Sequence, residues 1–171
     1  EAPVTRWFDT NTFFRQPTIA GPLSLKQPIA HGYYTSWFEL AKKPETYQPT
    51  LLSPYTFTKL SAVQAGVSEK DAAGYVGDLY DGLLDDATTQ GVQRIVLHEP
   101  FAAYHNIDGA ERRQLRQILG GIAANHPSLG IGVYFSFGDA RTLLKEFADD
   151  DRFSTLGADL GSTPFKGLPT V

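Results

Sequence analysis

Two neighbouring ionisable residues, His98 and Glu99, are the strongest chemical candidates in this sequence. They follow a short apolar run, residues 95–97, and precede Pro100. Imidazole can act as acid, base or ligand near neutral pH, and a buried carboxylate can hold a cationic ammonium group. Neighbouring strand residues face opposite ways, so at most one of the pair can point into a barrel interior unless the strand has ended before them. The alternative is a structural pair, with Glu99 in a salt bridge and His98 satisfied by its neighbours.

Hydroxyl groups follow a second apolar run in the same way. Ser53 and Thr56 lie just past residues 50–52. Their oxygens could bind a carboxylate, or they could cap a following helix. The sequence leaves both roles open.

A third polar group follows the apolar residues Trp7 and Phe8. Asp9, Thr10 and Asn11 could hydrogen-bond a ligand, or they could satisfy local backbone groups in an Asx-type turn. Asp159 lies near the end of a fourth apolar segment and could line the same cleft.

Other titratable residues fit surface or structural roles. None of His31, His105 and His126 has the helical i, i+4 spacing of a metal-binding pair. The acidic clusters at 81–86 and 149–151 do not match a calcium loop and are predicted to be solvated. With Cys 0 the chain has no thiolate nucleophile or thiolate zinc ligand, which fits a cytoplasmic protein.

Bulk properties exclude several classes of function. A net charge of -4 and a pI near 5.5 argue against nucleic acid and anionic membranes as partners. The apolar stretches are much shorter than the roughly 20 residues that span a bilayer. Met 0 indicates a processed or truncated chain, or a fragment.

Alternating strands and helices must position these residues. One helix is predicted after Ser68, since apolar residues recur at helical spacing, Asp71 completes a capping pattern and Gly91 can end the helix. A second helix is predicted to open at the Asp108–Glu111 capping pair. In all, the patterns predict about five strands and three or four helices. The predicted strands are 4–8, 50–53, 95–97, 131–137 and 153–160; the predicted helices are 68–90, one opening at 108, and 139–148. Residues 15–31 are predicted to be irregular, and residues 34–42 to form a short helix or strand extension.

This alternation predicts an α/β fold with a parallel sheet and right-handed crossovers. Two architectures fit: a partial (β/α)8 TIM barrel, or a five-stranded doubly wound parallel sheet. A complete barrel usually needs about 250 residues, so residues 1–171 would form a single barrel-type domain that is an incomplete fragment. In either fold, the strand ends that carry the polar groups would meet at one edge.

Taken in order, five segments resemble the N-terminal half of cobalamin-independent methionine synthase. They are residues 7–11 (WFDTN), 51–57 (LLSPYTF), 96–102 (VLHEPFA), 133–135 (VYF) and 156–160 (LGADL). The resemblance implies a barrel of the uroporphyrinogen decarboxylase/methionine synthase type. In that family a C-terminal barrel carries zinc and binds homocysteine, and the N-terminal barrel helps to form the folate site.

The resemblance therefore implies a supporting role in methyl transfer from methyltetrahydrofolate to homocysteine, in methionine biosynthesis. Candidate catalytic residues are His98 and Glu99. The predicted substrate-binding residues are Asp9, Asn11, Ser53, Thr56, His98, Glu99 and Asp159. No metal or cofactor is expected in this chain, and zinc is expected in a second barrel domain or a partner chain.

The sequence also departs from the family pattern. His98 replaces the Asp of the family's Asp-Glu-Pro, and Ser53 replaces a Gly. Gly132, Val133 and Tyr134 stand at the strand that carries zinc ligands in the catalytic barrel. Two other functions stay open: a non-catalytic or repurposed barrel that binds a small amino acid or pterin, and a metal-free lyase with His98 as base and Glu99 as its orienting group.

Overall fold

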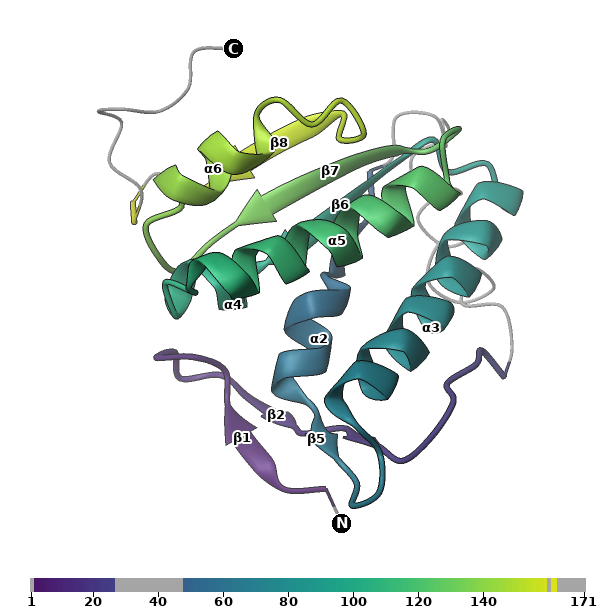
Figure 1. Ribbon diagram of the computed structural model, residues 1–171, viewed down its shortest axis with the longest axis vertical. Helices are drawn as coiled ribbons and strands as arrows, with labels where there is room; N and C mark the ends of the chain where they lie inside the picture. The colour runs from purple at the N-terminus through teal and green to yellow at the C-terminus, as the bar shows by residue number, and fades with distance from the viewer. Residues whose placement is uncertain (1, 27–47, 160, 163–171) are drawn as a thin grey trace.

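A four-stranded parallel sheet forms the centre of the molecule (Figure 1). The computed structural model describes residues 2–26, 48–159 and 161–162. Within them the strand order is β4-β6-β7-β8, so β4 and β8 are the outer strands. Their bounds are β4 (Thr50–Leu52), β6 (Arg94–Glu99), β7 (Gly130–Phe135) and β8 (Thr155–Ala158). The predicted strands at 50–53, 95–97, 131–137 and 153–160 are confirmed, with ends that differ by at most two residues.

The two faces of this sheet have different surroundings. One face carries fully buried apolar side chains that alternate along the strands, among them Ile95, Leu97 and Val133. On the other face, Thr50 and Thr155 are exposed, and His98 is half-buried. Alternation along each strand thus separates a fully buried face from a partly exposed one.

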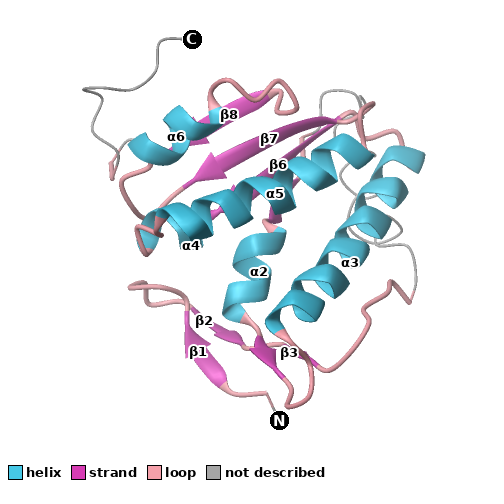
Figure 2. Cartoon of the chain, viewed as in Figure 1, coloured by secondary structure: helices cyan, strands magenta, loops and turns pink. Residues whose placement is uncertain are grey.

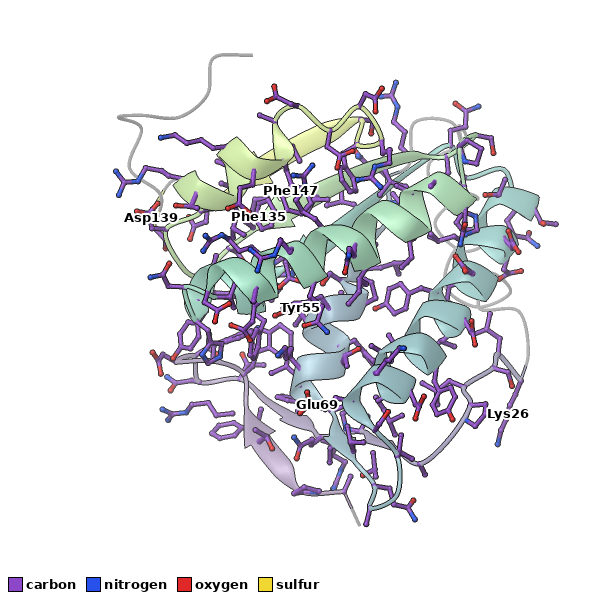
Figure 3. The ribbon with its side chains drawn as sticks, viewed as in Figure 1. Lys26, Tyr55, Glu69, Phe135, Asp139 and Phe147 are labelled. Atoms are coloured by element: carbon purple, nitrogen blue, oxygen red, sulfur yellow. The ribbon has the colours of Figure 1, made fainter. Side chains whose placement is uncertain are left out.

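The described helices pack on the buried face (Figure 2). The long helices are α3 (Glu69–Thr89) and α5 (Gly109–Asn125), with the shorter α6 (Arg141–Phe147) after β7. Figure 3 shows Phe147 of α6 beside Phe135 of β7, and their ring centroids are 5.5 Å apart. A helix layer on one face is what right-handed crossovers between neighbouring parallel strands produce.

The predicted helix starts are confirmed by their caps. Ser68 accepts a hydrogen bond from the backbone N–H of Asp71 at 3.0 Å and opens α3. Asp108 and Glu111 form a reciprocal capping box at the start of α5. Gly91 has a φ of 86°, so the chain leaves α3 through a left-handed residue where glycine is favoured.

Two short helices follow the ends of β4 and β6; the sequence left a helix after Ser53 open and predicted none after Glu99. They are α2 (Pro54–Leu60) and α4 (Pro100–Tyr104), and each has proline in its first turn. Proline lacks an N–H and has a fixed φ, so it ends a strand but suits the start of a helix. The prediction of three or four helices was therefore wrong, because five are present among the described residues.

The N-terminal region adds two small sheets. β1 (Val4–Arg6) pairs with β2 (Phe13–Arg15) as an antiparallel hairpin, and β3 (Thr18–Ile19) pairs with β5 (Ala62–Val63) in parallel. The prediction of about five strands was too low, since these short strands bring the described total to eight. β3 lies in the segment predicted to be irregular. The prediction for residues 34–42 falls outside the described residues.

The strand order bears on the two architectures considered. Neighbours in the main sheet follow one another along the chain, so the order does not reverse among the described strands. A doubly wound sheet requires such a reversal. The structure establishes a mixed α/β fold with parallel sheets, of which the main one has four strands. None of the helices in the described ranges is both long enough and apolar enough to cross a bilayer.

Candidate functional site

The carboxylate of Glu99 lies in a closed pocket of hydrogen-bond donors. Its side chain is fully buried at the end of β6. The hydroxyl of Ser53 donates to Oε2, and the hydroxyl of Thr56 donates to Oε1 at 2.6 Å. The backbone N–H of Ala102 also donates to Oε1, at 2.9 Å. No salt bridge to Glu99 is present among the described residues, so hydroxyls and a backbone amide take the place of a cation.

Local structure brings these donors together. Ser53 is the N-cap of α2, and its Oγ accepts the backbone N–H of Thr56 at 3.1 Å. Thr56 Oγ1 accepts the N–H of Phe101 at 3.2 Å. Each hydroxyl therefore accepts from the backbone and uses its single proton on Glu99. Ser53 and Thr56 perform both roles that the sequence left open: they bind a carboxylate, and Ser53 caps a helix.

Glu99 thereby ties two helices to the sheet. Its carboxylate bonds to the start of α2, while its own backbone position is the N-cap of α4. Burial raises the pKa of Glu99, and the hydrogen bonds from Ser53 and Thr56 oppose that rise. The pKa of Glu99 is raised overall, since a fully buried carboxylate without a cation is costly to ionise.

His98 lies on the opposite face of the same strand. Its Nε2 shares a 2.6 Å hydrogen bond with Oγ of Ser136, just past the end of β7. The ring centroid of Tyr134 is 5.5 Å away, and that of Phe137 is 6.4 Å away. Burial lowers the pKa of His98, which favours a neutral imidazole. Glu99 does not orient His98, because their side chains point to opposite faces; Ser136 makes that contact.

The β1–β2 turn carries the predicted residues Asp9 and Asn11. The hydroxyl of Thr10 donates to the carbonyl of Trp7 at 2.6 Å, so this residue serves the turn. The nearby carboxyl group of Asp9 raises the pKa of the Tyr104 phenol at the end of α4. Both Asp9 and Asn11 are exposed.

Phe8 connects this turn to the sheet edge. Its ring stacks on Phe137 with centroids 5.5 Å apart and contacts Tyr104 at 4.9 Å. Phe8 and Phe137 have φ values of 49° and 64°. Such left-handed conformations are uncommon for bulky residues and cost energy, and they concentrate at functional sites. The ring contacts of Phe8 pack the β1–β2 hairpin on the C-terminal end of β7.

Asp159 follows β8 at the same edge. Its backbone N–H donates to the carbonyl of Phe135 at 2.9 Å, which extends the pairing with β7 by one residue. Its carboxylate accepts from the N–H of Gly161 and the hydroxyl of Ser162, both at 2.9 Å. The carboxylate therefore stabilises the turn that leaves the strand.

Of the predicted site residues, the structure brings Ser53, Thr56 and Glu99 into one hydrogen-bonded group. His98 is the chain neighbour of Glu99 but lies on the other face of the sheet. Asp159 lies separately, just past the C-terminal end of β8. Sequence reasoning missed Ser136, the partner of His98. The signal was available: Ser136 is two residues beyond Tyr134, so strand alternation places both on the face of His98.

The donor set does not fit the zinc ion of the catalytic barrel. The chain contains no cysteine, and no group of three His, Cys, Asp or Glu in the described residues could hold a metal ion. Gly132, Val133 and Tyr134 of β7 offer no nitrogen or thiolate ligand. Glu99 already accepts three hydrogen bonds, and no step through zinc is assigned to this chain.

One protein-family model matches nearly the whole chain. The model of the cobalamin-independent synthase N-terminal domain matches residues 1–166. The chain belongs to this family. The expected resemblance is confirmed.

Individual relatives are distant. The chain is 23% identical over 144 residues to the 5-methyltetrahydropteroyltriglutamate–homocysteine methyltransferase of Streptococcus suis. The aligned region is 84% of this chain and 19% of that protein. The Lactococcus lactis protein of the same name is 24% identical over 157 residues, 92% of this chain and 20% of its own length. That of Trichodesmium erythraeum is 30% identical over 103 residues, 59% of this chain and 13% of that protein. The chain spans about a fifth of the length of the first two relatives.

Proposed function

We propose that this chain acts as a supporting N-terminal part of a cobalamin-independent methionine synthase-type methyltransferase. The observation that carries the proposal is the family match over residues 1–166. The reaction would transfer a methyl group from methyltetrahydrofolate to the sulfur of homocysteine, in the cytoplasm. Zinc, and with it thiolate activation, would come from a second barrel domain or chain, because zinc lowers the pKa of a bound thiol.

The proposal includes a partial (β/α)8 barrel. Two features support it: the sequential strand order and the placement of the described helices on one face. In a barrel the second face lines the interior, and active sites lie at the C-terminal ends of the strands. His98, Tyr134 and Ser136 would then face the barrel interior at that end.

The predicted ligand residues divide into two roles under this proposal. Ser53, Thr56 and Glu99 anchor α2 and α4, since they are buried and bonded to one another. His98 presents a neutral imidazole that can donate or accept a hydrogen bond, and Ser136 holds its orientation. Asp9, Asn11 and Asp159 supply polar groups around the edge.

Reconstitution tests the proposal. A zinc-bearing C-terminal barrel of this family would be assayed for methyl transfer to homocysteine with and without this chain. We expect stimulation by the wild-type chain and a large reduction with His98→Ala. A matched control, Lys70→Gln on the surface of α3, should stimulate fully. Absence of any stimulation by the wild-type chain would reject the supporting role.

Two departures from the family favour a second candidate, the binding of a small amino acid or pterin without turnover. His98 stands where the family pattern has Asp, and Ser53 stands where it has Gly. In a thermal-shift assay with homocysteine and methyltetrahydrofolate, this candidate predicts stabilisation by ligand even though the reconstituted mixture transfers no methyl group.

A further inference from the structure

A depression of about 450 Å³ opens beside the end of α4, outside the candidate site. Its lining residues come from α4, the loop after it, the β7–α6 loop and α6; they are Ala103, Tyr104, Asn106, Gly138, Asp139, Arg141, Thr142 and Lys145. None of the predicted catalytic or substrate-binding residues is among them. Its volume is within the roughly 300–1,000 Å³ of small-molecule sites.

The backbone around this depression is tightly constrained. A Cβ on Gly138 would lie 2.1 Å from the carbonyl oxygen of Ala103, so only glycine lets the β7–α6 loop rest against α4. Asn106, in the loop after α4, has a φ of 46°. Left-handed asparagine is less strained than other residues, but it still needs support from its surroundings. The close contact at Gly138 therefore fixes how the β7–α6 loop lies against α4.

Two cations share one side of the depression. Arg141 and Lys145 are four residues apart on α6 and therefore lie on one face. The Nε of Arg141 donates to both carboxylate oxygens of Asp139, at 3.0 and 2.8 Å, and its Nη2 donates to Oδ2. Figure 3 shows Asp139 at the margin of the molecule. This bidentate contact orients the guanidinium, and Nη1 makes no hydrogen bond within the described residues.

The charges do not cancel. Lys145 is exposed and makes no ion pair with the described residues, so two cations face one carboxylate. Asn106 and Thr142 add an amide and a hydroxyl. The Tyr104 ring forms an apolar wall. Cationic and neutral donors around a partly apolar hollow suit an anionic group on a small organic molecule.

We propose that this depression, the Arg141–Lys145 pocket, binds a small molecule through a carboxylate or phosphate group. Methyl transfer plays no part in this inference. Asp139 holds Arg141 in position before the ligand arrives, and this lowers the conformational cost of binding. The two anion types share the same donors, and separate probes distinguish them.

Calorimetric titration of the whole chain at low salt tests the pocket, with glutarate, inorganic phosphate and the neutral analogue glutaramide as probes. We expect glutarate or phosphate to bind and glutaramide not to bind. Lys145→Gln and Arg141→Gln should each weaken binding by about tenfold, as expected for the loss of a charge-assisted hydrogen bond. Lys70→Gln removes an exposed cation from α3 and should leave the affinity unchanged.

Three results would overturn the pocket: neither anion binds, glutaramide binds as well as glutarate, or Lys70→Gln weakens binding as much as Lys145→Gln. Unchanged thermal unfolding of each variant is the control for folding. Whichever of the two anions binds more tightly identifies the ligand's acidic group. Methyl-transfer stimulation by Lys145→Gln, measured separately, distinguishes failure of the pocket from failure of the proposed function.

Discussion

Glu99 and His98 are adjacent in β6, yet their surroundings are opposite. Glu99 is fully buried, and its two carboxylate oxygens accept three hydrogen bonds. His98 is half-buried on the partly exposed face and makes one side-chain hydrogen bond, to Ser136. The difference shows how one strand can hold residues for two tasks: Glu99, with both carboxylate oxygens occupied, holds the fold, and under the proposed function His98 would meet the ligand.

The largest expected effect is the loss of the Glu99 anchor. Glu99→Ala removes the acceptor for Ser53, Thr56 and the N–H of Ala102, and it leaves a cavity. We expect the free energy of unfolding to fall by about 3 kcal/mol or more. Urea denaturation measures this value. A loss below about 1 kcal/mol would show that Glu99 does not anchor α2 and α4.

Removing one hydroxyl donor should have a smaller effect. Thr56→Val keeps the shape of the side chain but leaves Glu99 Oε1 and the N–H of Phe101 each without one partner. We expect a loss of about 2 kcal/mol in the same denaturation experiment. The exposed Thr89→Val at the end of α3 is a matched control and should change stability little. Equal losses in the two variants would contradict the special role of Thr56.

The pH dependence of stability should reveal the buried carboxyl. Burial raises the pKa of Glu99 above its ordinary value of 4.5. Above that pH the unfolded state has released a proton that the folded state still binds. Stability contributed by Glu99 is therefore present below that value and is lost as pH rises through the raised pKa, by at most about 1.4 kcal/mol for each pH unit.

Comparison with Glu99→Gln isolates this effect. The amide does not titrate, so the difference in unfolding free energy between wild type and variant should shrink steadily with rising pH. Denaturation at a series of pH values measures it. A difference that is constant with pH would indicate that the pKa of Glu99 is the same in the folded and unfolded states.

The smallest effect on stability is expected at His98. His98→Ala should cost less than about 1 kcal/mol, because its side chain is half-buried and has one partner. Burial lowers the pKa of His98, so its contribution to stability is present above the ordinary value of 6.5 and is lost as pH falls through the lowered pKa. NMR titration of the ring would follow this, and Ser136→Ala should alter the titration if Ser136 fixes the ring.

Sequence reasoning found those parts of the fold that short-range patterns determine. The capping residues Ser68 and Asp108 marked the starts of α3 and α5 correctly because the cap contacts residues only three positions away. Apolar runs located all four strands of the main sheet. By contrast, the two-residue strands β3 and β5 show no periodicity, because their pairing joins segments far apart in the chain.

The site was predictable in composition but not in pairing. Ser53 and Thr56 were candidates to bind a carboxylate, and Glu99 was a candidate carboxylate. That they bind one another depends on the register of β4 against β6, in which Leu52 lies opposite His98. Register between distant strands is set by the whole sheet, so a local pattern cannot supply it.

The outer strands of the main sheet, β4 and β8, are paired on one side only within the described residues. Unpaired strand edges offer rows of amide and carbonyl groups to any passing chain. At high protein concentration, we therefore expect aggregation through these strand edges to limit the sample more than unfolding does. Thr50 on β4 and Thr155 on β8 are both exposed. Replacing either with lysine would place a positive charge on an outer strand, and we expect this to reduce aggregation in concentrated samples.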